Sequence, residues 1–414
     1  MFKDKYVVTY DEIYKAYIDC RKHKRLKESA IKYELDFAAE LEQLRQDLCT
    51  GAYEISSSVA FCVTYPKLRE VFAADFPDRI VHHLLINRLE KYFLNYFIQD
   101  TYNCIKGRGT LYGVQRVQLK MKELKERTDI PYERKFVGCF DIEGFFMSID
   151  KEILWKLLRN FLITTYKERD LQWVLWLTEK IVMHRPELLC KKNGNKDLFN
   201  YLPDNKTLFK MNGLGLAIGN LTSQIFANFY MTEFDIMMSS IPSITYARYV
   251  DDFRLFGDKE EILKLIPVIR KFLETHLHLK LHPRKICLQH FSKGCNFIGS
   301  KIYDWGILPG KRIVHNYRVL VDKYNKKSRE ELLKYGIERA AQHLNCYYGF
   351  VAHTCSYNVR IKFWNMIGDT LKEFLYPAKD YNYVKVKRKY TKTHAIQKHL
   401  SDIKKCQRES VRDK

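Results

Sequence analysis

Two adjacent aspartates stand near the middle of the chain, inside a segment rich in aromatic and β-branched residues. Asp251 and Asp252 occupy the centre of residues 246–256, whose pattern predicts a two-strand hairpin with the acids at its tip. Side-by-side carboxylates repel each other unless a cation neutralises them, so the pair indicates a divalent-metal site. Two such ions about 3.5–4 Å apart drive phosphoryl and nucleotidyl transfer. For an aspartate pair taken alone, a solvated turn is the alternative.

A third carboxylate lies at the end of an apolar run upstream. Residues 136–140 predict a short buried strand that ends at Asp141, followed by a turn and a helix over residues 151–161. Asp141 is therefore the candidate partner of the aspartate pair. Asp150 directly precedes the helix and is expected to cap its free backbone N–H groups. Glu143 is expected to be solvated.

Two glycine runs accompany these acids. Residues 213–219 allow close approach of the backbone to a ligand, and residues 220–230 have the small and apolar spacing of a helix packed on a sheet. Neither this run nor residues 107–113 has the spacing of the dinucleotide-binding fingerprint. Each run alone is typical of an ordinary tight turn, so their value lies in their order along the chain.

That order, a strand with an aspartate, a glycine turn with a helix and then an Asp-Asp hairpin, resembles the palm of reverse transcriptases. Upstream, residues 65–72 and 78–81 resemble the fingers segment that holds the incoming triphosphate. Downstream, residues 279–285 resemble the motif whose lysine faces the leaving pyrophosphate, and residues 296–299 resemble the primer grip. The match spans roughly residues 20–310. It implies an α/β (α+β) right-hand polymerase with fingers, a palm built on an RRM-like antiparallel sheet with helices, and a helical thumb.

The resemblance also implies a set of metal ligands. Asp141, Asp251 and Asp252 would hold a pair of Mg²⁺ ions, with the carbonyl of Ile142 as a further candidate ligand. All these ligands are hard oxygens, which favours Mg²⁺, with Mn²⁺ as a substitute.

Further residues are expected to contact nucleotide or nucleic acid. Lys67 and Arg69 would neutralise the triphosphate, although either could be an ordinary surface charge. Phe146 would block a 2′-hydroxyl and so favour deoxynucleotides, with core packing as its alternative. Lys285 would face the pyrophosphate. The candidate residues for binding template or primer are Arg79, Lys106, Arg108, Phe297, Gly299, Lys385, Lys387, Arg388 and Lys389.

Residues 218–224 are the most discriminating stretch within the family. Ile218, Gly219 and the closing Ser-Gln resemble the enzymes of diversity-generating retroelements, although Ala217 replaces a proline common in that group. Ile218 has no donor or acceptor where many relatives place a glutamine, so one polar check on base pairing is missing and low fidelity is expected. Gln224 is assigned to the same pocket, or to satisfying backbone groups at a helix start.

Composition supports a nucleic-acid partner. Lys plus Arg number 71 against 49 Asp plus Glu, a formal net charge of +22, and such a chain should bind polyphosphate with a strong dependence on salt. Eleven cysteines are scattered without a Cys-x-x-Cys pair, which indicates a reducing compartment and no zinc site. No long apolar run or leader is evident, so a cytoplasmic protein without a membrane partner is expected. The resemblance to prokaryotic reverse transcriptases implies that a bacterium or a phage encodes it.

We expect four regions along the chain. N-terminal helices and fingers would occupy residues 1–135, the palm 136–300 with an inserted loop at about 183–210, the helical thumb 301–376, and a basic tail 377–414 that folds on RNA or stays disordered. Residues 317–335 and 337–350 have the helical period expected of a thumb.

Three functional classes follow. The first is an error-prone reverse transcriptase of a diversity-generating retroelement, which copies a structured noncoding or template-repeat RNA from a DNA or RNA primer with dNTPs and a small basic accessory protein. The second is the same chemistry in antiphage defence, with a noncoding RNA as the template; group II intron enzymes are related to both. The third is a non-catalytic RNA-binding scaffold, disfavoured because all three acids are present.

Overall fold

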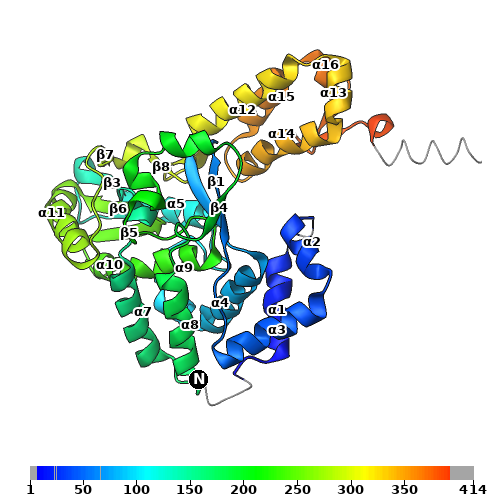
Figure 1. The fold of residues 1–414 in the computed structure, drawn as a ribbon. Coiled ribbons are helices and arrows are strands. Elements are labelled where there is room, and N and C mark those ends of the chain that lie inside the picture. The colour runs from blue at the N-terminus through cyan, green and yellow to red at the C-terminus, as the bar shows by residue number, and fades with distance from the viewer. Residues whose placement is uncertain (1–6, 23, 25, 66, 392–414) are drawn as a thin grey trace, which may run out of the picture. The chain divides into compact units, whose positions relative to one another are not determined.

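The computed structural model describes residues 7–22, 24, 26–65 and 67–391. Backbone contacts divide the chain into two compact units: unit 1 contains residues 1–113 and 128–289, and unit 2 contains residues 114–127 and 290–414. Helices and mainly antiparallel strands build the chain (Figure 1), which is the α/β class that the sequence predicted. The part of the chain that the structure describes contains no helix long and apolar enough to span a bilayer.

Unit 1 begins with helices, in line with the N-terminal helices expected within residues 1–135. They are α1 (Tyr10–Arg21), α2 (Glu28–Glu34) and α3 (Phe37–Thr50), and α1 packs along the long helix α4 (Phe76–Tyr96). Thr9 starts α1 with a capping box, in which its hydroxyl accepts from the Glu12 N–H and the Glu12 carboxylate accepts from the Thr9 N–H.

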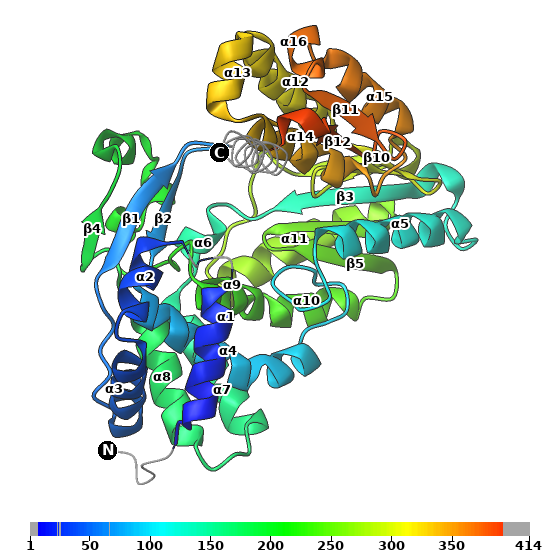
Figure 2. The same cartoon turned by 90° about the vertical axis from the view of Figure 1, so that its right-hand side faces the viewer.

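The central sheet of unit 1 has the strand order β5-β6-β3-β7. Its strands are β3 (Lys135–Asp141), β5 (Ile244–Tyr249), β6 (Asp252–Asp258) and β7 (Cys287–His290). The predicted strand and hairpin are therefore confirmed. β3 and β6 run antiparallel, which places Asp141 directly opposite Asp252. Helix α11 (Lys259–His276) packs on this sheet (Figure 2), and Gly138 permits its close approach because a Cβ there would lie 3.1 Å from Ile262.

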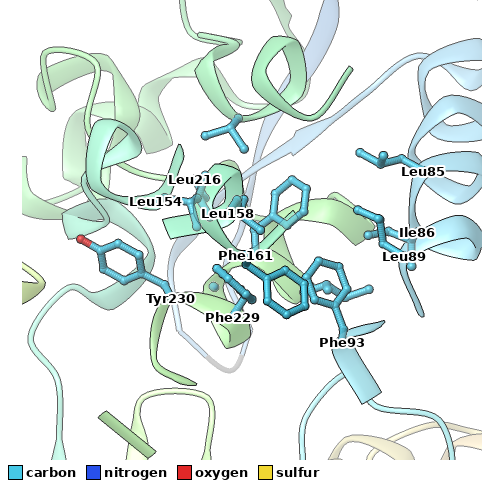
Figure 3. Packing of buried hydrophobic residues seen from close by; sticks show 14 of the residues in the cluster. Leu85, Ile86, Leu89, Phe93, Leu154, Leu158, Phe161, Leu216, Phe229 and Tyr230 are labelled. Atoms are coloured by element: carbon cyan, nitrogen blue, oxygen red, sulfur yellow. The ribbon is translucent and has the colours of Figure 1, made fainter. Parts of the chain in front are cut away.

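Together with α4, further helices bury the main hydrophobic core of unit 1. They are α6 (Phe145–Ser148), α7 (Lys151–Thr165), α8 (Leu171–Met183), α9 (Leu221–Tyr230) and α10 (Thr232–Ser239). Figure 3 shows Leu89 and Phe93 of α4 packing with Phe161 of α7 and Phe229 of α9. Asp150 caps α7 as predicted, since its carboxylate accepts from the N–H groups of Glu152 and Ile153 at 3.0 and 3.3 Å.

The insert at residues 183–210 is not an open loop. It contributes β4 (Cys190–Lys192), which pairs in parallel with β1 (Ser58–Val63), while β1 pairs antiparallel with β2 (Arg69–Ala73). Three short 3₁₀ helices follow: η2 (Lys196–Tyr201), η3 (Asp204–Lys206) and η4 (Leu208–Lys210). Phe199, Leu202 and Leu208 of the insert are buried against Ala60 and Phe72 of the hairpin.

Unit 2 contains small antiparallel strands and a helical part. The strands are β8 (Cys295–Phe297), β9 (Ser300–Ile302) and β10 (Ile307–Pro309) in one sheet, and β11 (Leu375–Ala378) with β12 (Tyr383–Val386) in a hairpin. The helices are α12 (Lys311–Asn325), α13 (Arg329–Tyr335), α14 (Ile337–Val351), α15 (Tyr357–Met366) and α16 (Asp369–Lys372). Helix α5 (Thr110–Glu126) links the two units.

Two expectations for this region differ from the structure. The helix expected over 317–335 is two helices, because Ser328 forms a capping box with Glu331 that starts a new one. The tail expected from residue 377 begins later, because β12 packs on α14 and the Asn345 amide hydrogen-bonds both backbone groups of Val384. Residues 392–414, the rest of the expected tail, lie outside the described residues.

A buried carboxylate in α4 gives a pH-dependent term to stability. Asp78 is fully buried and accepts from Tyr53 Oη at 2.7 Å and Ser56 N at 3.1 Å, and burial raises its pKa to about 6. The native state therefore holds this proton more tightly than the unfolded state, and stability falls as pH rises from about 4 to about 6.

We expect Asp78→Asn to remove that decline. The amide can accept from Ser56 N and donate to Tyr53 Oη, so at about pH 8 the variant should be more stable by about 2 kcal/mol. Urea unfolding between about pH 4 and pH 8 measures the effect, with the exposed Asp11→Asn as the control. Parallel pH profiles for the original chain and Asp78→Asn would rule this explanation out.

Candidate active site

The tip of the β5–β6 hairpin is strained and is held from two sides. Val250 has φ 60°, a conformation that β-branched residues rarely adopt. Its N–H donates to Asn103 Oδ1 at 2.9 Å, and its carbonyl accepts from Arg248 Nη1 at 2.8 Å. These two contacts fix the backbone on which Asp251 stands, because backbone strain persists only where neighbouring groups enforce it.

Arg248 is itself part of a buried polar network. Its side chain is 0% exposed and forms an ion pair with Asp235, which is 1% exposed. Asp235 also accepts from Tyr246 Oη at 2.7 Å and Thr101 Oγ1 at 3.0 Å, so its carboxylate is fully satisfied. Burial and the neighbouring Asp235 carboxylate raise the pKa of the Tyr246 phenol, which stays neutral. The network is a rigid support beneath the hairpin tip.

The sheet register brings the three predicted acids to one place. Asp141 ends β3 opposite Asp252, and the Ile142 N–H donates to the Asp251 carbonyl at 3.2 Å. Burial raises the pKa of Asp251 to about 6, and the charge of Asp141 adds to this shift. Burial also raises the pKa of Asp252, against the lowering effect of Arg254. The charge of Asp141 therefore raises the pKa of both Asp251 and Asp252, which is the repulsion expected among neighbouring carboxylates.

Protein cations already pair with two of these acids. Lys285 Nζ lies 2.7 Å from Asp141 Oδ1, and Arg254 forms a bidentate pair with Asp252. Within the described residues, no three His, Cys, Asp or Glu side chains form a ready-made metal cluster. The donor chemistry nevertheless fits divalent ions, because all three acids are hard oxygen ligands. After burial, the charge of Asp141 is the next contribution to the raised pKa of Asp251, so these two carboxylates repel each other. A metal would have to compete with Lys285 and Arg254 for these carboxylates.

A cavity of about 530 Å³ opens beside the hairpin tip, within the size range of small-molecule sites. Predicted site residues that line it are Asp251, Asp252, Arg69, Phe146, Ile218, Gly219 and Gln224. Its walls also include Asn103, Cys104, Tyr249 and Lys206, which the sequence did not single out. The cavity thus carries acids and cations together with an aromatic ring.

Gly219 fixes the floor of this cavity against β2. Its φ is 126°, and a Cβ there would lie only 2.6 Å from the Phe72 carbonyl oxygen. The Phe72 N–H donates to the Ile218 carbonyl at 2.9 Å, which pins the glycine turn to the β1–β2 hairpin. Gln224 stands at the start of α9, where its amide oxygen accepts from the Cys104 thiol at 3.1 Å.

Other predicted residues of unit 1 lie outside the cavity lining. Lys67 is exposed in the turn between β1 and β2, and Lys106 is exposed as well. Arg79 Nε donates to the Ala74 carbonyl at 2.7 Å, and Arg108 donates to the carbonyls of two residues in the preceding loop. Both arginines therefore have structural hydrogen bonds in this chain.

The predicted residues of unit 2 vary in exposure. Phe297 is 2% exposed, so its ring packs in the protein, and Gly299 has φ 76° in the β8–β9 turn. Lys387 Nζ donates to the Lys372 carbonyl at 2.9 Å. Lys385, Arg388 and Lys389 are exposed.

The sequence analysis did not identify the residues that support the hairpin tip. Asn103, Arg248 and Asp235 have no motif spacing, and a buried arginine looks like any surface charge in sequence. The only available signal was that Arg248 sits among apolar positions of a predicted strand, which is unusual for an unpaired charge.

Comparison with known proteins adds two findings. The family model for reverse transcriptase (RNA-dependent DNA polymerase) matches residues 66–302, more than half of the chain. No curated protein sequence matches the chain.

Solved structures that resemble the chain include telomerases of two yeasts. Telomerase from Candida albicans with a fragment of telomeric RNA is 11% identical, with a TM-score of 0.42 over 76% of this chain and 60% of that one. Apo telomerase from Candida tropicalis is 12% identical, with a TM-score of 0.43 over 80% and 63%. This chain thus spans less than two thirds of their lengths.

Proposed function

The chain belongs to the reverse transcriptase (RNA-dependent DNA polymerase) family, and from that premise we propose that it copies an RNA template into DNA by nucleotidyl transfer. The observation that carries the proposal is the pairing of Asp141 with Asp252 across the sheet, next to Asp251 in a cavity that also contains Arg69. Reverse transcriptases generally use divalent metal ions, and these three acids are the ligands that would hold them.

The expected cofactor is a pair of Mg²⁺ ions on Asp141, Asp251 and Asp252, with the Ile142 carbonyl as a further ligand. When bound, the ions supply the positive charge that activates a primer 3′-hydroxyl and stabilises the phosphate oxygens. Lys285 Nζ lies 2.7 Å from Asp141, and its proposed role is to face the leaving pyrophosphate as a point charge.

The nucleotide would occupy the cavity beside the acids. Arg69 offers a bidentate guanidinium to its phosphates, with the exposed Lys67 in the adjacent turn as a second charge. Phe146 lines the same cavity, is only half-buried and packs edge-to-face on Phe145. Its ring is thus available to contact the sugar.

We expect Phe146→Ala to relax sugar selection. Removing the ring opens space for a 2′-hydroxyl, so the use of rNTP relative to dNTP should rise about 10- to 100-fold. Single-nucleotide extension with each substrate measures the ratio, and Phe146→Tyr, which keeps the ring, is the control. An unchanged ratio in Phe146→Ala would leave core packing as the role of this residue.

Ile218 bears on fidelity. It lines the cavity beside Gln224, and its aliphatic side chain offers no hydrogen bond to a nascent base pair. The resemblance to diversity-generating enzymes implies errors opposite template adenine, and we expect Ile218→Gln to lower them by about tenfold, because a polar contact then rejects poor base-pair geometry. Sequencing the products of copied templates gives the error rate, with Ile218→Leu as the control. Equal error rates for the two variants would contradict this role.

The template is proposed to be a structured noncoding RNA or a template-repeat RNA. The charge of +22 supports strong binding to nucleic acid, and the residues at 218–224 resemble diversity-generating enzymes. In that setting a DNA or RNA primer, dNTPs and a small basic accessory protein complete the system in a cytoplasmic ribonucleoprotein. Antiphage defence with a noncoding RNA as the template is the alternative role, because reverse transcriptases used in phage defence share much of the palm.

One experiment tests the function directly. The chain is purified with its bound RNA, supplied with Mg²⁺ and labelled dNTPs, and any product is sequenced. We expect DNA complementary to the bound RNA, with errors concentrated opposite adenine for a diversity-generating role. A product that is unrelated to the bound RNA, or no product with added primed templates, would defeat the proposal.

A further inference from the structure

The insert at residues 183–210 plays no part in the chemistry described so far, yet it is firmly attached beside the cavity. The Asn193 N–H donates to the Ala60 carbonyl at 2.8 Å, and the Ser58 N–H donates to the Leu189 carbonyl at 3.1 Å. Together with the β1–β4 pairing, these bonds make β4 of the insert the edge strand of the sheet whose β2 contains Arg69.

A buried carboxylate anchors the end of the insert. Glu70, in β2, is 1% exposed and accepts from Thr207 Oγ1 at 2.7 Å and from Leu208 N at 2.9 Å. A buried acid costs stability unless donors satisfy it, so these bonds hold residues 207 and 208 in place. Because Glu70 directly follows Arg69 in β2, the insert is fixed next to a residue of the nucleotide cavity.

The short helix η3 of the insert also forms part of the cavity wall. A Cβ added at Gly144 would lie 3.3 Å from the Asn205 carbonyl oxygen, so η3 contacts the turn that follows Asp141. Lys206, the last residue of η3, lines the cavity together with Arg69, Asp251 and Asp252.

The side chain of Lys206 has no acidic partner among the described residues. Across the described ranges it forms no salt bridge, whereas Lys210 in the same insert pairs with Asp204 at 2.6 Å. The cavity lining therefore contains two cations, Arg69 and Lys206, and two acids at the hairpin tip. Glu70 is a third acid of the lining, and its buried carboxylate already accepts from Thr207 and Leu208. A polyphosphate that carries divalent ions matches this arrangement, because its phosphates face the cations and its metals face the acids.

We propose that the insert delivers Lys206 as a phosphate-binding residue for the incoming deoxynucleoside triphosphate, held in place by Glu70. This inference rests on the proposed function and deepens it, since it gives the insert a role in substrate binding. Thr207 is then a positioning residue, because its hydroxyl links Glu70 to the backbone that carries Lys206.

Steady-state kinetics and direct binding test the proposal. Lys206→Ala should raise the KM for dNTP about tenfold, the loss of one charge-assisted contact, with kcat within about twofold and the Kd for primer–template unchanged. Lys206→Arg should restore most of the affinity. Lys196→Ala is the matched control, since Lys196 is an exposed lysine of the same insert outside the cavity lining.

Binding of inorganic tripolyphosphate by calorimetry separates this inference from the proposed function. The original chain should bind it more tightly than Lys206→Ala, whether or not the protein polymerises DNA. The inference is overturned if Lys206→Ala and Lys196→Ala bind tripolyphosphate with equal affinity. It is also overturned if Lys206→Ala lowers the affinity for primer–template instead. Absence of DNA synthesis by the original chain overturns the proposed function alone.

Discussion

Asp251→Asn should reduce DNA synthesis by about 10³-fold or more and leave the protein at least as stable as before. The loss follows from removing one of three acids that would hold the catalytic ions, whose charge stabilisation is worth several kcal/mol. The gain in stability follows from the raised pKa of Asp251, since burial and Asp141 disfavour its charge in the metal-free protein. Primer extension and urea unfolding measure the two effects on the same preparation.

The control for this prediction is Glu143→Gln, which removes a half-buried acid two residues after Asp141 without touching the cavity lining. It should synthesise DNA at close to the original rate. If Asp251→Asn kept more than a tenth of the activity, Asp251 would not be a metal ligand. If it unfolded more easily than the original chain above about pH 6, the repulsion inferred among the three acids would be wrong.

Arg248→Met should destabilise the protein by about 3–5 kcal/mol and also impair catalysis. The substitution leaves Asp235 buried without its counter-charge, and it removes the donor that holds the Val250 carbonyl at the hairpin tip. Because Val250 has an unfavourable φ, its turn should relax and move Asp251. Urea unfolding gives the stability, and primer extension gives the activity.

A second substitution separates these two effects. Arg248→Met combined with Asp235→Asn removes the buried charge, and the amide can still accept from Tyr246 Oη and donate to Thr101 Oγ1, so most of the stability should return. Activity should stay low, because the Val250 carbonyl still lacks its donor. Recovery of both would show that Arg248 acts through folding alone. The exposed pair Arg329–Glu373 is the control, and Arg329→Met should cost less than about 1 kcal/mol.

Local patterns predicted the elements that carry the acids. The alternation of residues 246–256 gave the hairpin, the apolar run before Asp141 gave β3, and Asp150 was assigned as a helix cap. These predictions succeeded because period, strand ends and caps depend on neighbouring residues. The same local signals gave the N-terminal helices.

Long-range partners were beyond this kind of inference. The pairing of β4 with β1 joins segments more than 120 residues apart, and the ion pair of Arg248 with Asp235 depends on the packing of α10 against β5. Similarly, nothing near Lys285 in sequence indicates that it pairs with Asp141, 144 residues away. Such contacts follow from the fold as a whole.

Binding of Mn²⁺ to the purified protein tests most directly whether the three acids form a metal site. Electron paramagnetic resonance or calorimetry should detect Mn²⁺ on the original chain with nucleotide present, and the binding should be lost or greatly weakened in Asp141→Asn and Asp251→Asn but not in Glu143→Gln. The absence of Mn²⁺ binding, or binding that both aspartate variants retain, would mean that Lys285 and Arg254 neutralise these acids permanently and that the site is not a metal-dependent polymerase centre.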